Sequence, residues 1–275
     1  MRRWVKRVAL GCALVLLTGA VALTVLEQQR RQQVSQIAGP GVDDPVAPAP
    51  DANLAQKYSA PGAFDALCSS VQRRFGDMQA RHYHLRHHRK MRVTELDRRG
   101  RPVAITEMLD RVHFEDRKEC NTRLEARPVL GTLTDDTNFR SGLNANTRAP
   151  FSDDTPSGLY RYTLEGVETA ADRSVVRIRF EPVEPVEGSF TGSVWVDPET
   201  TEPVRMRGAA AKLPQFVDRL ELLMEYGPAE NGHAQMRRGV MDVVGGFAFY
   251  FKHYRIEAEL SDYRPLEAGP HPSEP

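Results

Sequence analysis

The chain has 275 residues, with 37 basic and 37 acidic side chains. Residues 1–26 contain four of the basic residues and no acidic residue, so the remaining 33 bases and 37 acids give the rest of the chain a net charge of −4. This charge excludes a nucleic-acid-binding protein, because neutralising phosphates requires a net basic surface. The sequence contains no G-x-S-x-G, Walker, H-E-x-x-H or C-x-x-C motif, so we expect no enzyme activity, no catalytic residues and no cofactor.

The N-terminus combines a basic cluster with an apolar run. Four bases in MRRWVKR precede 19 uncharged residues, Val8 to Leu26. This length is close to the roughly 20 residues that cross a bilayer as a helix, and the preceding bases keep the N-terminus cytoplasmic. We predict that residues 1–26 are either a signal peptide, cleaved near Ala20-Val21-Ala22, or an uncut transmembrane anchor. In both cases the rest of the chain is exported to the periplasmic side of the inner membrane.

Two different patterns follow the N-terminal segment. Residues 27–60 have no apolar periodicity and are dominated by Gln, Pro, Ala and Asp, which predicts a flexible linker. In residues 62–79 apolar side chains recur at steps of three and four, as on the buried face of an amphipathic helix. These side chains are Phe64, Leu67, Cys68, Val71, Phe75 and Met78.

From residue 82 to residue 264 apolar and polar residues mostly alternate, as in YRYTLEG and VVRIRF. This alternation is typical of strands with one buried face. DPETTEP predicts the turn of one hairpin, and Gly245-Gly246 in VVGGFAF predicts another. Because few segments could form crossover helices, we predict a mainly β domain over residues 61–265, with eight or nine antiparallel strands covered by the N-terminal helix. Residues 266–275 are predicted to be a disordered tail.

One segment, residues 128–157, interrupts this pattern because it is polar and rich in turn residues. Loops of this length in compact domains are usually functional or mobile. Its acidic pairs, Asp135-Asp136 and Asp153-Asp154, lack the alternating spacing of a calcium-binding loop. We therefore predict no calcium site there.

The stretch RHYHLRHHRK, residues 81–90, holds four of the eight histidines. A two-residue turn at Arg99-Gly100 would pair residues whose numbers sum to 199. This register places His87 and an Arg89–Asp110 pair on an otherwise apolar face. We interpret the opposite face as a solvated cationic surface; the alternatives are contact with anionic lipid headgroups and a zinc site formed by His84, His113 and Glu115. The residues assigned to the opposite face are His82, His84, Arg86, His88, Lys90 and Arg92.

Two cysteines, Cys68 and Cys120, follow the N-terminal segment. In an oxidising compartment such a pair is more often a disulfide than a reactive site, so these residues are the disulfide candidate. The alternative is two buried thiols that never meet.

Three stretches of the chain carry a resemblance to a known family. In the first, the helix Phe64–Met78 runs into MQARHYHLRHHRKMRV; the others are GLYRYTLEGVETAADRSVVRIRFEP and GSFTGSVWVDPETTEPVRMRG. The last contains V-W-V-D, a short turn and a returning E-P-V-R. Together they resemble the lipoprotein-carrier superfamily (LolA/LolB-like), in which this phrase is common, and in particular its uncharacterised outer-membrane lipoprotein-sorting-like branch. The resemblance covers roughly residues 62–264. It implies a curved, half-open barrel covered by helices that encloses an apolar cavity for acyl chains.

A curved sheet with an apolar concave face must be covered, or it exposes a large patch that binds something. We therefore expect a non-enzymatic cell-envelope protein that binds lipid or lipoprotein acyl chains in an apolar cup. The alternative is a sensor or interaction module of the same fold that binds an envelope protein; zinc binding on the histidine face is a further alternative. The candidate ligand-binding residues are Tyr83, Leu85, Met91, Met108, Phe114, Tyr160, Tyr162, Phe180 and Val194.

Overall fold

The computed structural model describes residue 28 and residues 52–133, 148–152, 155–156, 158–170, 173–228, 234–247 and 250–266. Helices α2 (Ala52–Ser59) and α3 (Ala63–His82) precede ten strands. The strands are β1 (Leu85–Leu96), β2 (Pro102–Glu115), β3 (Lys118–Leu130), β4 (Tyr160–Ala170), β5 (Arg173–Pro182), β6 (Phe190–Val196), β7 (Pro203–Ala210), β8 (Val217–Pro228), β9 (Ala234–Phe247) and β10 (Tyr250–Pro265).

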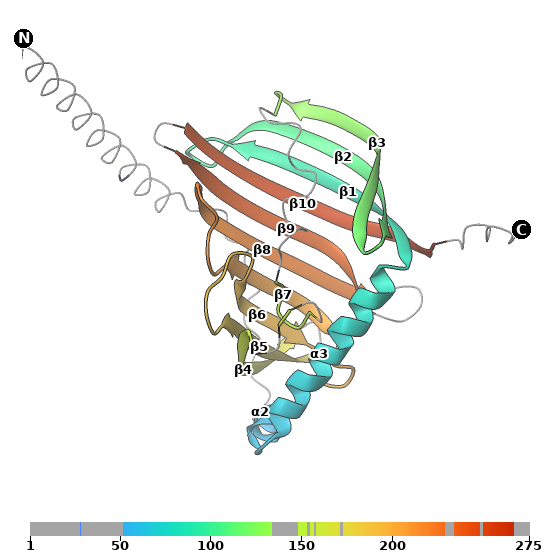
Figure 1. The fold of residues 1–275 in the computed structure, drawn as a ribbon, viewed down its shortest axis with the longest axis vertical. Coiled ribbons are helices and arrows are strands. Elements are labelled where there is room, and N and C mark those ends of the chain that lie inside the picture. Colours follow the sequence, from blue (N-terminus) through green and yellow to red (C-terminus); the bar gives the residue numbers. More distant parts are fainter. Residues whose placement is uncertain are drawn as a thin grey trace, which may run out of the picture.

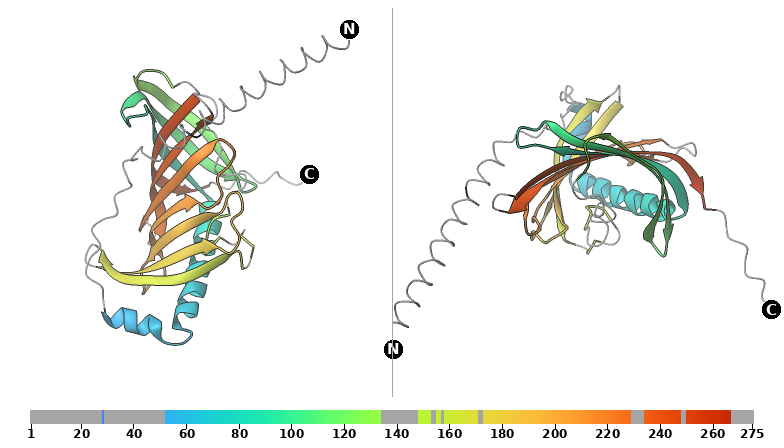
Figure 2. Two further views of the ribbon diagram at one scale, coloured as in Figure 1. Left: turned by 90° about the vertical axis from the view of Figure 1, so that its left-hand side faces the viewer. Right: turned by 90° about the horizontal axis from the view of Figure 1, so that it is seen from above.

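All ten strands form one antiparallel sheet, in the order β3-β2-β1-β10-β9-β8-β7-β6-β5-β4. The sheet arches, and α3 crosses its concave side (Figures 1 and 2). The prediction of a mainly β fold with a curved antiparallel sheet under a helix is confirmed. The sheet has ten strands, whereas the sequence predicts eight or nine. Residues 121–130 of β3 are all exposed, so this edge strand lacks the one-sided apolar pattern on which the strand count depends.

The predicted register of the first hairpin is confirmed. Met91 lies opposite Met108 and Arg92 opposite Glu107, pairs whose numbers sum to 199. The turn includes Gly100 at φ 74°, and Asp97 stabilises it by accepting backbone hydrogen bonds from Arg99 (2.8 Å) and Arg101 (2.9 Å). The register slips by one residue only next to the turn, between Glu95 and Leu96.

The turn predicted at Gly245-Gly246 is wrong, because both residues lie inside β9. The hairpin closes later, where Phe247 pairs with Tyr250. Gly245 is needed for a different reason: a Cβ atom there would lie 2.4 Å from the carbonyl oxygen of Phe216, the residue before β8. A glycine within a strand can mark such a close backbone approach instead of a turn.

The regions flanking the sheet differ in part from the prediction. The C-terminal end of the predicted linker 27–60 is helix α2, and its Tyr58 is buried. The predicted membrane segment 1–26 and residues 267–275 of the predicted tail lie outside the described residues. Within the described part of the chain, no helix has the length and apolar character needed to span a bilayer.

The segment 128–157 is not one continuous loop. Residues 128–130 complete β3, and residues 134–147 and 153–154 lie outside the described residues. Phe151 returns to the core and is only 1% exposed. Its backbone φ of 62° lies in the left-handed region, which a non-glycine residue adopts only where the surroundings hold it.

Candidate functional site

The main apolar cluster lies between α3 and the concave face of strands β4 to β8. Leu67, Val71 and Phe75 form the buried face of α3, as their spacing predicts. The strands contribute alternate residues, because successive side chains of a strand point to opposite faces. The buried members from outside α3 are Tyr58, Phe151, Tyr160, Val167, Val176, Ile178, Phe180, Phe190, Val194, Val196 and Met206, with Leu220, Leu222, Met224 and Tyr226 of β8 half-buried against them.

Two tyrosine hydroxyls in this cluster, those of Tyr160 and Tyr162, form hydrogen bonds with backbone groups. The Tyr160 hydroxyl donates to the carbonyl oxygen of Arg148 (2.6 Å) and accepts from the backbone N–H of Phe190 (3.0 Å). The Tyr162 hydroxyl accepts from the backbone N–H of Phe151 (3.2 Å), and burial raises its pKa to about 12. Because these hydroxyls already have partners, Tyr160 and Tyr162 present mainly ring carbon to whatever packs against them.

A second, smaller apolar cluster lies on the same face at the other end of the sheet. Its buried members are Val93, Ala104, Met108, Leu133 and Tyr254, with Met91 and Ile256 packed against them.

An ionic group borders this second cluster. Asp110, only 1% exposed, pairs with Arg89 (3.5 Å) and with the Nε of Arg123, and Arg89 also binds Glu119 (2.8 Å). The predicted Arg89–Asp110 pair is therefore confirmed and extended by two residues of β3. Burying a carboxylate is tolerated only with such partners.

Aromatic and imidazole rings join the C-terminal end of α3 to the sheet. His82 is the last residue of α3, and its ring centroid lies 5.2 Å from that of His87 and 4.9 Å from that of Phe114. Tyr263 lies 5.0 Å from His87, and Tyr83 lies 5.3 Å from Phe114. Burial lowers the pKa of His82, and it lowers the pKa of His87 to about 3, with smaller contributions from neighbouring basic side chains. Both histidines are therefore neutral at physiological pH.

The histidine stretch divides almost as expected. His87 faces the apolar side and is 3% exposed, as predicted. His82 is a correction: it was assigned to the solvated face, but α3 continues to this residue and its ring packs in the aromatic group. The helix extends further than the strand pattern indicates, because the pattern cannot distinguish the last helical turn from the start of β1.

The nine candidate ligand-binding residues do not form one cluster. Tyr160, Tyr162, Phe180 and Val194 lie beneath α3. Met91 and Met108 belong to the second cluster, and Tyr83 and Phe114 belong to the aromatic group. Leu85 is half-buried at the start of β1.

Sequence reasoning missed Phe151. Its ring stacks on Tyr162 (centroids 4.4 Å apart) and on Phe75 (5.4 Å), so it connects the sheet to α3. The sequence does contain a sign of its role, since Phe151 is a large apolar residue within a polar segment. Its environment, however, depends on contacts with residues far away in the sequence.

The predicted disulfide is not formed, because Cys68 and Cys120 are both free thiols. Cys68 lies on α3 against the main cluster, whereas Cys120 lies on β3, at the sheet edge opposite β4. Burial raises the pKa of the Cys68 thiol to about 12. This thiol is therefore protonated and unreactive at neutral pH.

The proposed zinc grouping is also changed. His113 and Glu115 lie close together (Nε2 to Oε1, 3.1 Å), but their neighbour is Cys120, directly opposite His113 on β3. One donor atom from each of these three residues lies within 4.8 Å of the others, which suits a transition metal with mixed ligands. His84 precedes β1 and is exposed.

No protein-family model and no curated protein matches the sequence. Similar solved structures include a LolA superfamily protein from Nitrosomonas europaea, with 12% identity and a TM-score of 0.38 over 74% of this chain and 94% of that protein. An outer membrane lipoprotein-sorting protein domain from Vibrio parahaemolyticus has 11% identity and a TM-score of 0.37 over 74% and 94%. A MucA/MucB complex from Pseudomonas aeruginosa contains a chain with 10% identity and a TM-score of 0.25 over 73% and 99%.

One of these structures is described as a member of the superfamily that three stretches of this sequence resemble. At these identities and TM-scores the likeness says nothing about a ligand, which has to be inferred from the residues of this chain.

Proposed function

We propose that this protein is a non-enzymatic cell-envelope protein that binds acyl chains of a lipid or lipoprotein between α3 and the concave face of the sheet. The observation that carries the proposal is the thin cover over the main apolar cluster. One continuous apolar cluster spans strands β4 to β8, and α3, with α2 and the loop residue Phe151, covers it. If α3 moves away, a ligand of matching chemistry has to take its place, because an exposed apolar face of this size is unfavourable.

The composition of the cluster favours hydrocarbon chains. Its side chains are aliphatic, aromatic and methionine residues, and the hydroxyls of Tyr160 and Tyr162 are already hydrogen-bonded to the backbone. Methionine side chains such as Met206 and Met224 adapt to irregular apolar shapes. A cavity opened here would therefore accept a chain without polar atoms more readily than a sugar or a peptide backbone.

The two ends of α3 differ in a way that suggests how the cup opens. The N-cap of the helix is Gly62 at φ 77°, which makes no side-chain capping hydrogen bond. The C-terminal end is held by the rings of His82, His87 and Phe114. We therefore place the opening at the Gly62 end, with the C-terminal end of α3 as the pivot.

The test uses the two native thiols of the full chain. Cys68 is half-buried against the cluster and its pKa is raised, so acyl chains that displace α3 should expose it further and speed its alkylation. Cys120 lies outside the cup and is the internal control. The ligand is a monoacylglycerol, which has an acyl chain but no charge. Native mass spectrometry of the same samples counts bound ligand.

We expect one or a few bound acyl chains and a rise in Cys68 alkylation of roughly tenfold or more, as for a local opening made about 1.4 kcal/mol more favourable, with Cys120 unchanged. Absence of bound monoacylglycerol, together with an unchanged Cys68 rate, would falsify the proposal.

A protein partner is the second candidate, and the exposed edge strand β3 favours it. Every residue from 121 to 130 is exposed, including Leu124, Val129 and Leu130 at 40–48%. Such an edge can pair with a strand of another protein. In the same mass spectra, a stoichiometric protein partner whose binding is independent of acyl ligand would support this function over the first.

A further inference from the structure

Along most of β1, the outward-facing cations have acidic partners on the neighbouring strands. Lys90 lies opposite Glu259 of β10, and Arg92 lies opposite Glu257 of β10 and Glu107 of β2. Arg92 and Glu107 form an ion pair of 3.6 Å. Opposite charges facing each other across strands stabilise a sheet, and like charges destabilise it.

At the beginning of β1 this complementarity is reversed. Arg86 lies opposite Arg264 of β10, and His88 lies opposite Arg111 of β2. These four side chains share the outer face of the sheet, since they alternate with residues of the concave face. The sequence therefore places three guanidinium groups and an imidazole next to one another, at a cost in repulsion that the neighbouring pairs avoid.

Among the residues that line this part of the sheet surface, Asp262 is the carboxylate. The register of β1 and β10 shifts between Arg86 and His88, and Asp262 in this irregularity has φ 54°. Its carboxylate binds Arg264 (2.7 Å) and His88 (3.5 Å). Counted over these lining residues alone, Asp262 and the three arginines give a formal charge of +2 when His88 is neutral.

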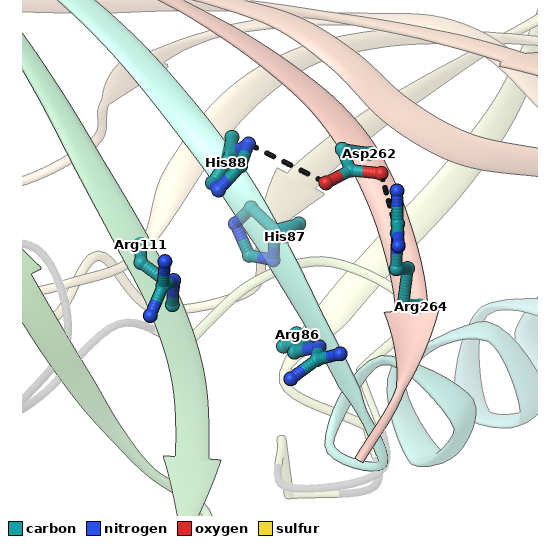
Figure 3. Close-up of a pocket in the computed structure, with 6 residues that line it drawn as sticks. All are labelled: Arg86, His87, His88, Arg111, Asp262 and Arg264. Atoms are coloured by element: carbon teal, nitrogen blue, oxygen red, sulfur yellow. Dashed lines mark hydrogen bonds and ion pairs between the residues drawn. The ribbon is translucent and has the colours of Figure 1, made fainter. Parts of the chain in front are cut away.

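These residues surround a pocket. Its volume is about 230 Å³, and its lining residues are Arg86, His87, His88, Arg111, Asp262 and Arg264. Figure 3 shows Arg111 on one side of the pocket and Asp262 with Arg264 on the other, with Arg86, His87 and His88 between them. A cavity needs about 10–15 Å³ of such volume to hold one water molecule, so the pocket has room for a tetrahedral oxyanion.

We propose that this pocket binds a phosphoryl group. Arginine presents a planar fork of donors that matches phosphate oxygens and remains charged at all physiological pH values. A doubly charged phosphate would neutralise the formal charge of +2, and it would relieve the repulsion between Arg86 and Arg264 and between His88 and Arg111. The site lies on the opposite face of the sheet from the apolar cup and does not depend on acyl binding there.

The phosphoryl group can belong to a free phosphate compound or to a lipid headgroup. To distinguish the two sources, the full chain is titrated with inorganic phosphate and with glycerol 3-phosphate by calorimetry, in chloride buffer of matched ionic strength. It is also tested for co-flotation with vesicles of phosphatidylcholine alone and with a quarter of phosphatidylglycerol. The two vesicle types carry identical acyl chains, so a difference between them reports the headgroup and not the cup.

The variant is Arg111→Gln, which removes one lining cation and also relieves a like-charge contact, so the fold should persist. Arg92→Gln is the matched control, because Arg92 lies on the same outer face and pairs with Glu107 away from the pocket. We expect Arg111→Gln to weaken binding roughly ten- to a hundred-fold, as for the loss of a charge-assisted hydrogen bond, and Arg92→Gln to have little effect.

Phosphate or glycerol 3-phosphate binding that Arg111→Gln weakens supports the site with a soluble ligand. Binding confined to phosphatidylglycerol vesicles, and weakened by the same variant, supports it with a lipid headgroup as the source. If no probe binds, or if Arg92→Gln weakens binding as much as Arg111→Gln, the cationic group is only a charged surface and the proposal is wrong. Melting temperatures of both variants in chloride establish that each is folded.

Discussion

His87 shows how one side chain of the histidine stretch differs from its neighbours. It is 3% exposed, and its Nδ1 atom is buried without a hydrogen-bond partner among the described residues. Its surroundings are the rings of His82 and Tyr263, which accommodate a neutral imidazole but not a charged one. By contrast, His88 is one-third exposed and lies 3.5 Å from a carboxylate oxygen of Asp262.

This contrast predicts an acid-sensitive fold. Burial lowers the pKa of His87 in the folded chain to about 3, well below the ordinary value of about 6.5. Between these two pH values His87 is protonated in the unfolded chain but not in the folded chain. The free energy of unfolding should therefore fall as the pH drops from about 6.5 towards 3, by up to about 1.4 kcal/mol per pH unit for this group. Above about pH 6.5 the contribution of His87 is constant.

Urea unfolding at pH 7, 6, 5 and 4 measures this slope. The variant His87→Phe keeps an apolar ring in the cluster and cannot be protonated, so its stability should depend less on pH than that of the wild type. Equal slopes for His87→Phe and the wild type would show that other groups cause the acid sensitivity.

At the scale of elements, the helix and the sheet are joined by aromatic contacts from a segment that has no regular structure. Phe151 stacks between Phe75 of α3 and Tyr162 of β4, and Ser152 donates a hydrogen bond from its Oγ to Gln79 of α3 (3.0 Å). The position of α3 over the cup therefore depends on residues 151–152 as well as on its own apolar face.

Replacing Phe151 by alanine should destabilise the protein by about 3–5 kcal/mol, because a buried aromatic side chain is lost and a cavity remains. Phe216→Ala is the matched control, since the Phe216 side chain is 54% exposed and its removal should cost about 1 kcal/mol or less. Chemical denaturation of both variants measures the difference. Similar values would show that the core beneath α3 does not depend on Phe151.

At the scale of the whole molecule, the sheet is organised around the pairing of its first and last strands. β1 pairs with β10, and every other neighbour in the sheet is also a neighbour in the sequence. The β1–β10 register extends from Leu85–Pro265 to Glu95–Tyr254, and Lys252 binds Glu95 across it (2.7 Å). The junction between β1 and β10 therefore forms only when residues more than 150 positions apart meet, which is slow compared with hairpin formation.

This topology predicts a gradient of amide hydrogen exchange. Amides in β1, β9 and β10 have paired strands on both sides and should exchange only through global unfolding. β3 is an edge strand with exposed side chains from residue 121 to residue 130, so its outward amides should exchange many times faster. Hydrogen–deuterium exchange with mass spectrometry measures both in one sample. Equal protection of β3 and β10 would indicate that something covers the edge.

Much of this architecture follows from local patterns. The period-two alternation identified the strands and the register of Met91 with Met108, and steps of three and four identified the buried face of α3. The turn predicted at Gly245-Gly246 was wrong, because both residues lie inside β9. Gly245 is needed there because the backbone of Phe216, which is distant in the sequence, lies close to it. Strand β3 shows little alternation of apolar and polar residues, because both faces of this edge strand are exposed and neither face needs to be apolar.

The candidate site was predictable only in part, for the same physical reason. Alternation determined which residues of each strand face the concave side, so Tyr160, Tyr162, Phe180 and Val194 could be assigned to that face from the sequence. Only the tertiary structure decided that these four lie beneath α3, that Met91 and Met108 belong to a separate cluster, and that Cys68 and Cys120 remain apart. It also decided that Arg86 meets Arg264, because a cross-strand pair between β1 and β10 depends on how the whole sheet closes and not on any local run of residues.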